Sequence, residues 1–222
     1  MLLKNLIKYS HKRYNKLNIK GLAINSKEVR KEFIFFAING NQSNGEKYIN
    51  EAIAKGARVI ICSNKCKFNS NKIIVFKTKN IRNFLSEITS KFYTLKPKNI
   101  IAVTGTNGKT SVADYFYQIL NINNILASSI GTLGFKYDNK IILNNLTSPD
   151  TITLHKILEK LKKNNINNVI IEASSHGLDQ SRLNHINFKA GIFTNFSQDH
   201  LDYHKTMKAY LNTKLTLFSK LN

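Results

Sequence analysis

A glycine-rich loop is the most specific chemical motif in the chain. The stretch "VTGTNGKTS", which begins at Val103, follows an apolar run typical of a buried strand and precedes a helix-like stretch. Gly105 and Gly108 allow backbone N–H groups to approach an anion closely, and the positive end of a helix adds attraction. Lys109 can then reach terminal phosphates, and the Thr110 hydroxyl can bind Mg2+. Because Val103 stands where the strict pattern has glycine, the sequence predicts a variant phosphate loop.

Acidic and imidazole side chains follow two other apolar runs. Ligands of open α/β sheets bind along the carboxyl ends of the strands, so a metal-binding acid is expected there. Glu172 ends the run "NVII" and fits this position, although a solvated glutamate is the alternative. The run "AGIFTNF" precedes Asp199, His200, Asp202 and His204. The spacing of the two histidines fits a zinc pair, and it fits two surface histidines better.

A lysine interrupts an apolar helix face near the end of the chain. At helical spacing, Lys214 falls among apolar residues, namely Met207, Tyr210, Leu211, Leu217 and Phe218. One interpretation is that the stem packs along this face while the amine reaches water. The other is that the amine lies inside a site, where desolvation favours its neutral and reactive form.

Alternating strands and helices are expected to position these groups, so the predicted fold class is α/β. Residues 22–95 alternate short strand-like runs with helix-like stretches, which predicts a small α/β unit. Pro97 interrupts the pattern before a new apolar run, so we predict two domains, 1–97 and 98–222. The second alternates strand, loop and helix, which is typical of a mainly parallel sheet flanked by helices.

Composition restricts the possible settings of the protein. The chain has 222 residues, of which 42% are hydrophobic, enough to build one large or two small cores. No apolar run approaches the roughly 20 residues of a spanning helix, and no signal-peptide pattern is present, so we expect a cytoplasmic location without membrane insertion. Cys62 and Cys66 are too few for a disulfide framework. The net charge of +21 is spread along the whole chain without a nucleic-acid-binding signature, so no nucleic acid partner is expected.

Taken in order, the motifs resemble those of the Mur ligases, the ATP-dependent enzymes that add amino acids to the peptidoglycan precursor. The matching stretches are "TGTNGKTS", "TSPD", "EASSHGLDQSR" and "TNFSQDHLDYHKTMKAYLNTK". They are most similar to those of the members that make UDP-N-acetylmuramoyl-tripeptide. The loop alone is also similar to that of folylpolyglutamate synthetase. The resemblance implies an N-terminal UDP-binding domain at 1–97 and a P-loop-type, ATP-binding central domain at 98–222.

The resemblance also implies roles for individual residues. ATP would be bound by Gly105, Thr106, Asn107, Gly108, Lys109, Thr110 and Ser111. The implied catalytic residues are Lys109, His200 and Lys214, the last carbamylated by CO2. Two Mg2+ ions are implied, with ligands among Thr110, Glu172 and His200. UDP-N-acetylmuramoyl-dipeptide would be bound by Ile24, Ser26, Asn41, Gln42, Ser43, Thr147, Ser148, Ser174, Gln180 and Arg182.

The reaction implied by the resemblance is amide formation in peptidoglycan synthesis. ATP phosphorylates the terminal carboxylate of the dipeptide, and the amine of a free amino acid, diaminopimelate or lysine, then displaces phosphate. Family members continue after the matched lysine with further strands and a C-terminal domain that binds this amino acid. We therefore expect a truncated central domain, in a ligase that needs a C-terminal part supplied by a separate or longer chain. The alternatives are a non-catalytic remnant that binds ATP or the UDP-sugar, another Mur-type ligase, and folylpolyglutamate synthetase.

Overall fold

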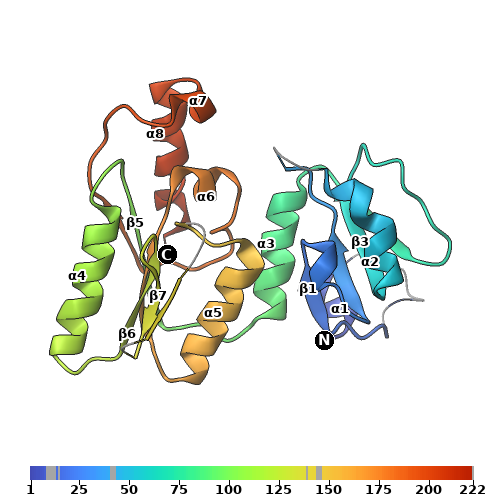
Figure 1. Ribbon diagram of the computed structural model, residues 1–222, viewed down its shortest axis with the longest axis horizontal. Helices are drawn as coiled ribbons and strands as arrows, with labels where there is room; N and C mark the ends of the chain where they lie inside the picture. Colours follow the sequence, from blue (N-terminus) through green and yellow to red (C-terminus); the bar gives the residue numbers. More distant parts are fainter. Residues whose placement is uncertain (9–13, 15, 41–43, 139, 144–146, 222) are drawn as a thin grey trace. The chain divides into compact units, whose positions relative to one another are not determined.

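The computed structural model describes most of the chain, namely residues 1–8, 14, 16–40, 44–138, 140–143 and 147–221. The chain divides into two compact units, Met1–Phe92 and Tyr93–Asn222, which are described separately (Figure 1). This division falls shortly before Pro97, where the sequence predicts a domain boundary. Among the described residues, no helix combines the length and apolar character needed to cross a lipid bilayer.

The N-terminal unit is built on a parallel four-stranded sheet in the order β1-β2-β3-β4. Its strands are β1 (Gly21–Ala23), β2 (Phe33–Phe36), β3 (Ala57–Ser63) and β4 (Ile74–Thr78). Its helical segments are α1 (Leu3–Leu6), η2 (Ser26–Glu28), η3 (Gly45–Tyr48), α2 (Ile49–Ala54) and α3 (Ile81–Phe92). Ile49 and Ala52 of α2 share a buried cluster with Phe35 and Ile60, so the apolar side of this helix covers one face of the sheet.

The C-terminal unit is built on a six-stranded sheet in the order β10-β5-β9-β6-β7-β8. Its strands are β5 (Asn99–Thr104), β6 (Ala127–Gly131), β7 (Gly134–Tyr137), β8 (Lys140–Ile142), β9 (Asn168–Glu172) and β10 (Ala190–Phe193). Its helical segments are α4 (Lys109–Ile122), α5 (Thr151–Lys163), α6 (Ser175–Asp179), α7 (Leu201–His204), α8 (Met207–Leu215) and η4 (Phe218–Lys220). The mainly parallel α/β fold predicted from the sequence is confirmed, while the antiparallel strands β7 and β8 at one edge were not predicted.

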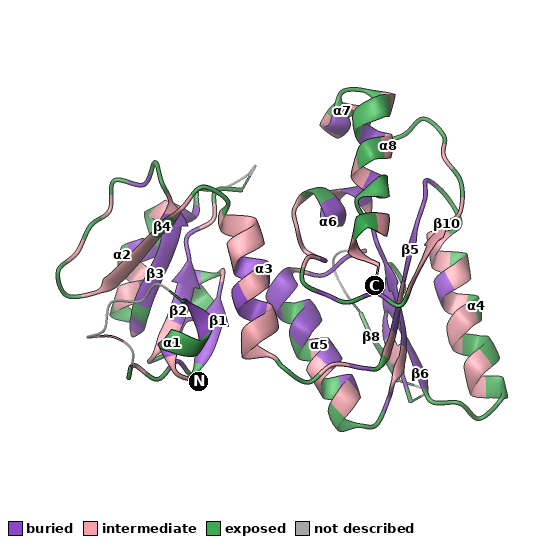
Figure 2. Cartoon of the chain, turned by 180° about the vertical axis from the view of Figure 1, so that it is seen from behind, coloured by how far each residue is buried: buried purple, intermediate pink, exposed green. Residues whose placement is uncertain are grey.

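Apolar residues on both faces of β9 explain why helices cover the sheet on two sides. Successive strand residues point to opposite faces. Ile170 packs with Val103 and with Ala113 of α4, whereas its neighbours in β9 belong to a larger cluster that contains Leu154 and Leu158 of α5. Figure 1 shows α4 and α5 on opposite sides of the sheet, and Figure 2 shows that the strands between them are mostly buried.

Strand register brings four loops to the carboxyl edge of this sheet. Val103 of β5 pairs with Glu172 of β9, and Ile171 of β9 pairs with Ile130 of β6. On the other side of β5, Thr104 pairs with Phe193 of β10. The loops that follow these strands therefore lie side by side, and α6, α7 and α8 gather at the same edge (Figure 1).

Candidate nucleotide and substrate site

The glycine-rich loop connects β5 to α4 at this edge. Gly105 and Gly108 have φ angles of 142° and 81°, which favour glycine because a side chain would be strained there. The first N–H groups of α4 lack acceptors within the helix, so they are available to an anion in front of it. Val103 lies inside β5 and packs against Ala113 of α4.

The segment after β10 holds the loop in place. The N–H of Thr106 donates to the carbonyl of Asn195 at 3.0 Å. The N–H of Asn107 donates to Oδ1 of Asn195 at 3.0 Å, and Nδ2 of Asn195 returns a bond to the carbonyl of Asn107 at 3.2 Å. The Thr106 hydroxyl accepts from the N–H of Ser197 at 3.0 Å and donates to its carbonyl at 3.1 Å. These bonds fix the backbone of the loop without using the N–H groups of the first turn of α4, which includes Ser111.

Glu172 is a buried carboxylate whose partners are all uncharged. Its side chain is 1% exposed. Oε2 accepts the hydroxyl of Thr110 at 2.8 Å and that of Thr132 at 3.1 Å, while Oε1 accepts the N–H of Thr132 at 2.9 Å. The ion pairs of the described residues do not include Glu172. A buried carboxylate surrounded by hydroxyls suits a hard cation such as Mg2+. Thr110, the other expected ligand, already contacts this carboxylate.

Lys214 is buried, so the interpretation that its amine reaches water is wrong. The residue is 1% exposed, and its Nζ donates to the carbonyl of Gly105 at 2.6 Å and lies 4.4 Å from the ring centroid of Tyr210. Burial, and after it the charge of Lys109, lower the pKa of Lys214 to about 8, while the charge of Asp199 opposes the shift. Near pH 8 a much larger fraction of this amine is therefore neutral than of an exposed lysine, and the neutral form is the one that reacts with CO2. Carbamylation itself stays a prediction.

Lys109 also turns toward the loop. Its Nζ donates to the carbonyls of Gly105 and Thr106 at 2.9 and 2.8 Å. Burial lowers the pKa of Lys109, and the negative charges of Glu172 and Asp199 oppose this shift. The amine thus lies against the loop that precedes α4 and is attracted by the carboxylates of Glu172 and Asp199.

The contacts of His200 are with Asp199, His176 and Tyr210. It is exposed, it adopts the left-handed backbone conformation (φ 52°) before α7, and its Nε2 is 3.4 Å from Asp199 Oδ2. Its ring lies 4.9 Å from that of His176, centroid to centroid. In the described part of the chain, no group of three His, Cys, Asp or Glu side chains could hold a metal ion. The metal role of His200 therefore stays a prediction.

The histidine four residues later behaves differently. His204 is buried, so the expectation of two surface histidines is wrong for this residue. Its ring packs against those of Tyr203 and Tyr210, with centroid distances of 4.8 and 5.2 Å. Burial lowers the pKa of His204, and the neighbouring charge of His176 adds to the effect. This environment favours a neutral, packed imidazole.

Residues predicted to contact the dipeptide form one hydrogen-bonded group beside Glu172. The Ser148 hydroxyl donates to the backbone carbonyl of Glu172 at 2.8 Å and lies 3.0 Å from Oγ of Ser174. Arg182 donates from Nη1 to the carbonyl of Ser148 at 2.6 Å and from Nη2 to Oε1 of Gln180 at 2.8 Å. The structure therefore brings these four predicted residues together at the edge that carries the loop.

The remaining predicted contacts belong to the N-terminal unit. Ser26 is buried, and its hydroxyl donates to Oε2 of Glu51 at 2.8 Å. Ile24 follows β1 directly and is half-buried. Asn41, Gln42 and Ser43 lie outside the described residues. The uridine-binding role of these five residues stays a prediction.

Three residues at the carboxyl edge were not predicted as parts of the site. Thr132 holds Glu172, and Asn195 holds the loop through the bonds given above. The hydroxyl of Tyr210 lies 3.4 Å from Oγ1 of Thr106, and its ring covers the Lys214 amine. The rule that ligands bind at strand carboxyl ends applies to Thr132 and Asn195 as it does to Glu172. Tyr210 stands one helical turn before Lys214 and therefore shares its face.

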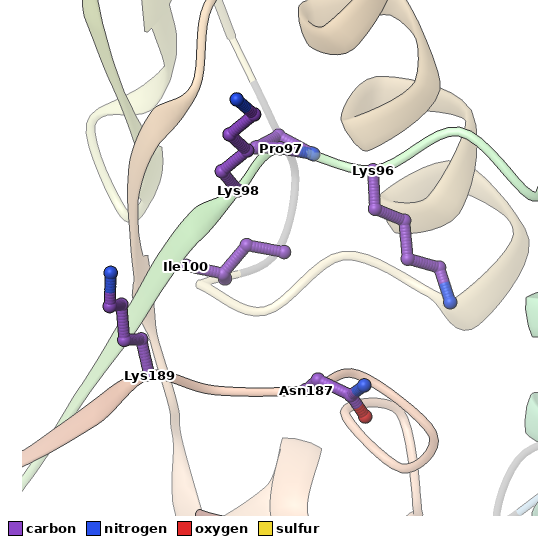
Figure 3. Close-up of a pocket in the computed structure, with 6 residues that line it drawn as sticks. All are labelled: Lys96, Pro97, Lys98, Ile100, Asn187 and Lys189. Atoms are coloured by element: carbon purple, nitrogen blue, oxygen red, sulfur yellow. The ribbon is translucent and has the colours of Figure 1, made fainter. Parts of the chain in front are cut away.

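A basic pocket of about 390 Å³ lies at the other end of β5. It is lined by Lys96, Pro97, Lys98, Ile100, Asn187 and Lys189. Figure 3 shows that the three ammonium groups lie apart and do not converge on one point. Lys96 donates to the carbonyl of His185, and Lys189 donates to the side chain of Asn99. The pocket is therefore separate from the candidate site and does not form a single anion cradle.

Fold and site together define an α/β protein with two sheet-based units, the second of which carries a phosphate-loop-like turn beside a buried carboxylate. The family model for the Mur ligase middle domain matches residues 103–222, and the model described as the Mur ligase family catalytic domain matches residues 18–93. The chain belongs to the Mur ligase family.

Relatives of known sequence and structure agree with this assignment. The UDP-N-acetylmuramoyl-L-alanyl-D-glutamate–2,6-diaminopimelate ligase of Rickettsia conorii is 45% identical over 205 residues, which cover 90% of this chain and 42% of the relative. The ligase of the same name from Wigglesworthia glossinidia brevipalpis is 40% identical over 94% of this chain and 44% of its own length. A solved structure of a ligase with this name superposes with a TM-score of 0.86 at 26% identity, covering all of this chain and 46% of that one. The Thermotoga maritima MurF ligase in complex with ADP shares the fold, with a TM-score of 0.62 at 21% identity over 91% of this chain and 44% of that one.

Proposed function

We propose that this chain forms the nucleotide-binding and UDP-sugar-binding part of an ATP-dependent amide ligase that acts in peptidoglycan synthesis. The substrates would be UDP-N-acetylmuramoyl-L-alanyl-D-glutamate and 2,6-diaminopimelate, since the relatives named above carry these compounds in their names. The chain spans less than half the length of those relatives. The observation that carries the proposal is the position of Glu172, whose carboxylate contacts the loop through Thr110 and whose backbone carbonyl contacts Ser148.

Loop and helix would bind the phosphates of ATP. The residues from Gly105 to Ser111 would surround the phosphates, and the first turn of α4 would supply backbone N–H groups, since those of Thr106 and Asn107 donate to Asn195. The amine of Lys109 would exchange its carbonyl partners for phosphate oxygens. Thr110 and Glu172 would hold a Mg2+ ion, with His200 contributing to a second. The bound metal would neutralise phosphate oxygens as charge develops during transfer.

The dipeptide would lie along the hydrogen-bonded group beside Glu172. Arg182, together with Thr147, Ser148, Ser174 and Gln180, would orient its terminal carboxylate toward the γ-phosphate. One carboxylate oxygen attacks phosphorus, the bond from the γ-phosphorus to the bridging oxygen breaks, and ADP leaves with the electron pair. The product is an acyl phosphate, from which the amine of diaminopimelate would displace phosphate. No side-chain nucleophile is needed.

Lys214 would serve this site as a carbamate. Its neutral amine adds to CO2, loses a proton and becomes a carboxylate next to the loop, which reverses the charge at this position. A negative group close to Gly105 would then help to position Mg2+, whereas the protonated amine would repel it.

The test uses the first half of the reaction, because the residues proposed for it lie in this chain. The chain is mixed with Mg2+, γ-labelled ATP, the UDP-dipeptide and hydroxylamine, which converts an acyl phosphate to a stable hydroxamate and phosphate. We expect ADP and hydroxamate that depend on the UDP-dipeptide, loss of both in Lys109→Ala, and no change in Lys98→Ala at the far end of β5.

A second candidate is a chain that binds these ligands without catalysis. Saturable binding of ATP and the UDP-dipeptide with neither ADP nor hydroxamate would favour that function over the ligase. If neither ATP nor the UDP-dipeptide binds, both the ligase function and the non-catalytic binding function are overturned.

A further inference from the structure

Thr132 forms hydrogen bonds to both oxygens of the Glu172 carboxylate. Its N–H donates to Oε1 at 2.9 Å and its hydroxyl lies 3.1 Å from Oε2. The residue follows directly after β6, whose neighbour in the sheet is β9, so strand pairing sets its distance from Glu172. A Cβ added at Gly131 would overlap the glutamate side chain. The turn is therefore shaped so that this carboxylate fits against it.

The Thr132 hydroxyl faces two acceptors with a single proton. It lies 3.1 Å from both Oε2 of Glu172 and Oγ1 of Thr147, and in both contacts Thr132 is the donor. A hydrogen bond to a carboxylate is the stronger of the two, so Glu172 competes best for this proton. The N–H of Thr132 donates to Glu172 in either case.

We propose that Thr132 is a positioning residue that fixes the orientation of the Glu172 carboxylate for the cation. This inference rests on the proposed function, because it assigns Glu172 to the cation of the nucleotide. A glutamate has three rotatable side-chain bonds. Hydrogen bonds to both of its oxygens restrict the rotation of the carboxylate before the cation binds. Thr110 donates its hydroxyl proton to the same Oε2, which leaves the lone pairs of its own oxygen for the metal.

The test measures cation binding directly, without turnover. Mn2+ replaces Mg2+, and its binding to the full chain saturated with ADP is followed by electron paramagnetic resonance. We expect Thr132→Val and Thr132→Ala to weaken Mn2+ binding about 10-fold, as for other groups that orient a metal ligand. Thr132→Ser keeps the hydroxyl and should bind within about 2-fold of the unchanged chain. Thr147→Val should also keep Mn2+ affinity within about 2-fold, because the hydrogen bonds from Thr132 to Glu172 remain. The same variant should weaken binding of the UDP-dipeptide.

The outcomes separate this inference from the proposed function. Mn2+ binding that is lost in Glu172→Gln but unchanged in both Thr132→Val and Thr132→Ala would overturn the role of Thr132 and leave the ligase assignment in place. Equal loss in Thr132→Ser and Thr132→Val would also overturn it, since the hydroxyl would then not be the active group. Absence of Mn2+ and ADP binding to the unchanged chain would overturn the proposed function itself. Melting curves identify any variant that does not fold. If one of Thr132→Val and Thr132→Ala fails to fold, Mn2+ binding to the other one tests the role of Thr132.

Discussion

The amines of Lys109 and Lys214 donate hydrogen bonds to one shared acceptor, the carbonyl oxygen of Gly105, at 2.9 and 2.6 Å. Two ammonium groups so close together repel each other, and the deeper one is removed from water. This arrangement accounts for the pKa of Lys214, which burial and then the charge of Lys109 lower to about 8. The loop is therefore in contact with a lysine of α8 that loses its proton at a lower pH than an exposed lysine does.

The shifted pKa predicts a pH-dependent stability. Below about pH 8 Lys214 is protonated in both the folded and the unfolded chain, so its burial penalty is fully present. Between about pH 8 and about pH 10.4 the unfolded chain binds the additional proton, so the free energy of unfolding rises with pH. In CO2-free buffers, urea unfolding should show a gain on the order of 3 kcal/mol over this range that is absent in Lys214→Met. Lys208→Met, an exposed position on the same helix, is the control, and parallel curves for all three chains would contradict the prediction.

Carbamylation of Lys214 is a separate prediction. Only the neutral amine reacts with CO2, so the lysine with the lowered pKa should react at a pH where exposed lysines are protonated. Incubation with 13C-bicarbonate near pH 8 should give a carbamate resonance in 13C NMR spectra. The resonance should persist in Lys208→Met, disappear in Lys214→Met and weaken as the pH falls. A resonance that survives in Lys214→Met would assign the carbamate to another amine.

Elements with a clear apolar period could be predicted from the sequence, and elements without one could not. The helix α5 has the sequence "TITLHKILEKLKK", in which apolar positions recur at helical spacing, and Asp150 caps its first turn, so its pattern is visible in the sequence. Strand β6 was missed because its sequence "ASSIG" is fully buried yet contains small and polar residues. Ser128 is satisfied there by donating to the carbonyl of Lys136 at 2.7 Å, a contact that local sequence does not reveal.

The same distinction applies to the site. Lys109 and Thr110 stand inside a local motif, and the position of Glu172 at the end of an apolar run places it at the correct edge. Thr132 and Asn195 lie far from their partners in the sequence and meet them only through the register of parallel strands. Periodicity does not determine that register, so the partners of these two residues could be identified only in the folded structure.

The two loop glycines should differ in their tolerance to alanine. In Gly105→Ala the new Cβ overlaps Oγ1 of Thr194 and the φ angle of 142° is strained, so we expect a loss of more than about 2 kcal/mol in unfolding free energy. In Gly108→Ala the nearest atoms lie 3.8 Å away, so only backbone strain of about 1 kcal/mol remains. Thr194→Ala removes the overlapping oxygen and should partly rescue Gly105→Ala. A double-mutant cycle without coupling would show that the overlap does not determine the cost.

Asn195 should control nucleotide affinity without touching the nucleotide. Its side chain makes two hydrogen bonds to the backbone of Asn107, so Asn195→Ala releases the loop whose N–H groups are proposed to bind phosphate. Two hydrogen bonds of about 1 kcal/mol each correspond to a loss in ATP affinity of roughly 10-fold to 30-fold, measured by calorimetric titration. The matched control is Asn123→Ala, which removes a side-chain hydrogen bond to the carbonyl of Ile119 at the far end of α4. Equal affinities in the two variants would mean that the loop keeps its shape without Asn195, whereas a loss confined to Asn195→Ala would show that the segment after β10 preorganises the phosphate site.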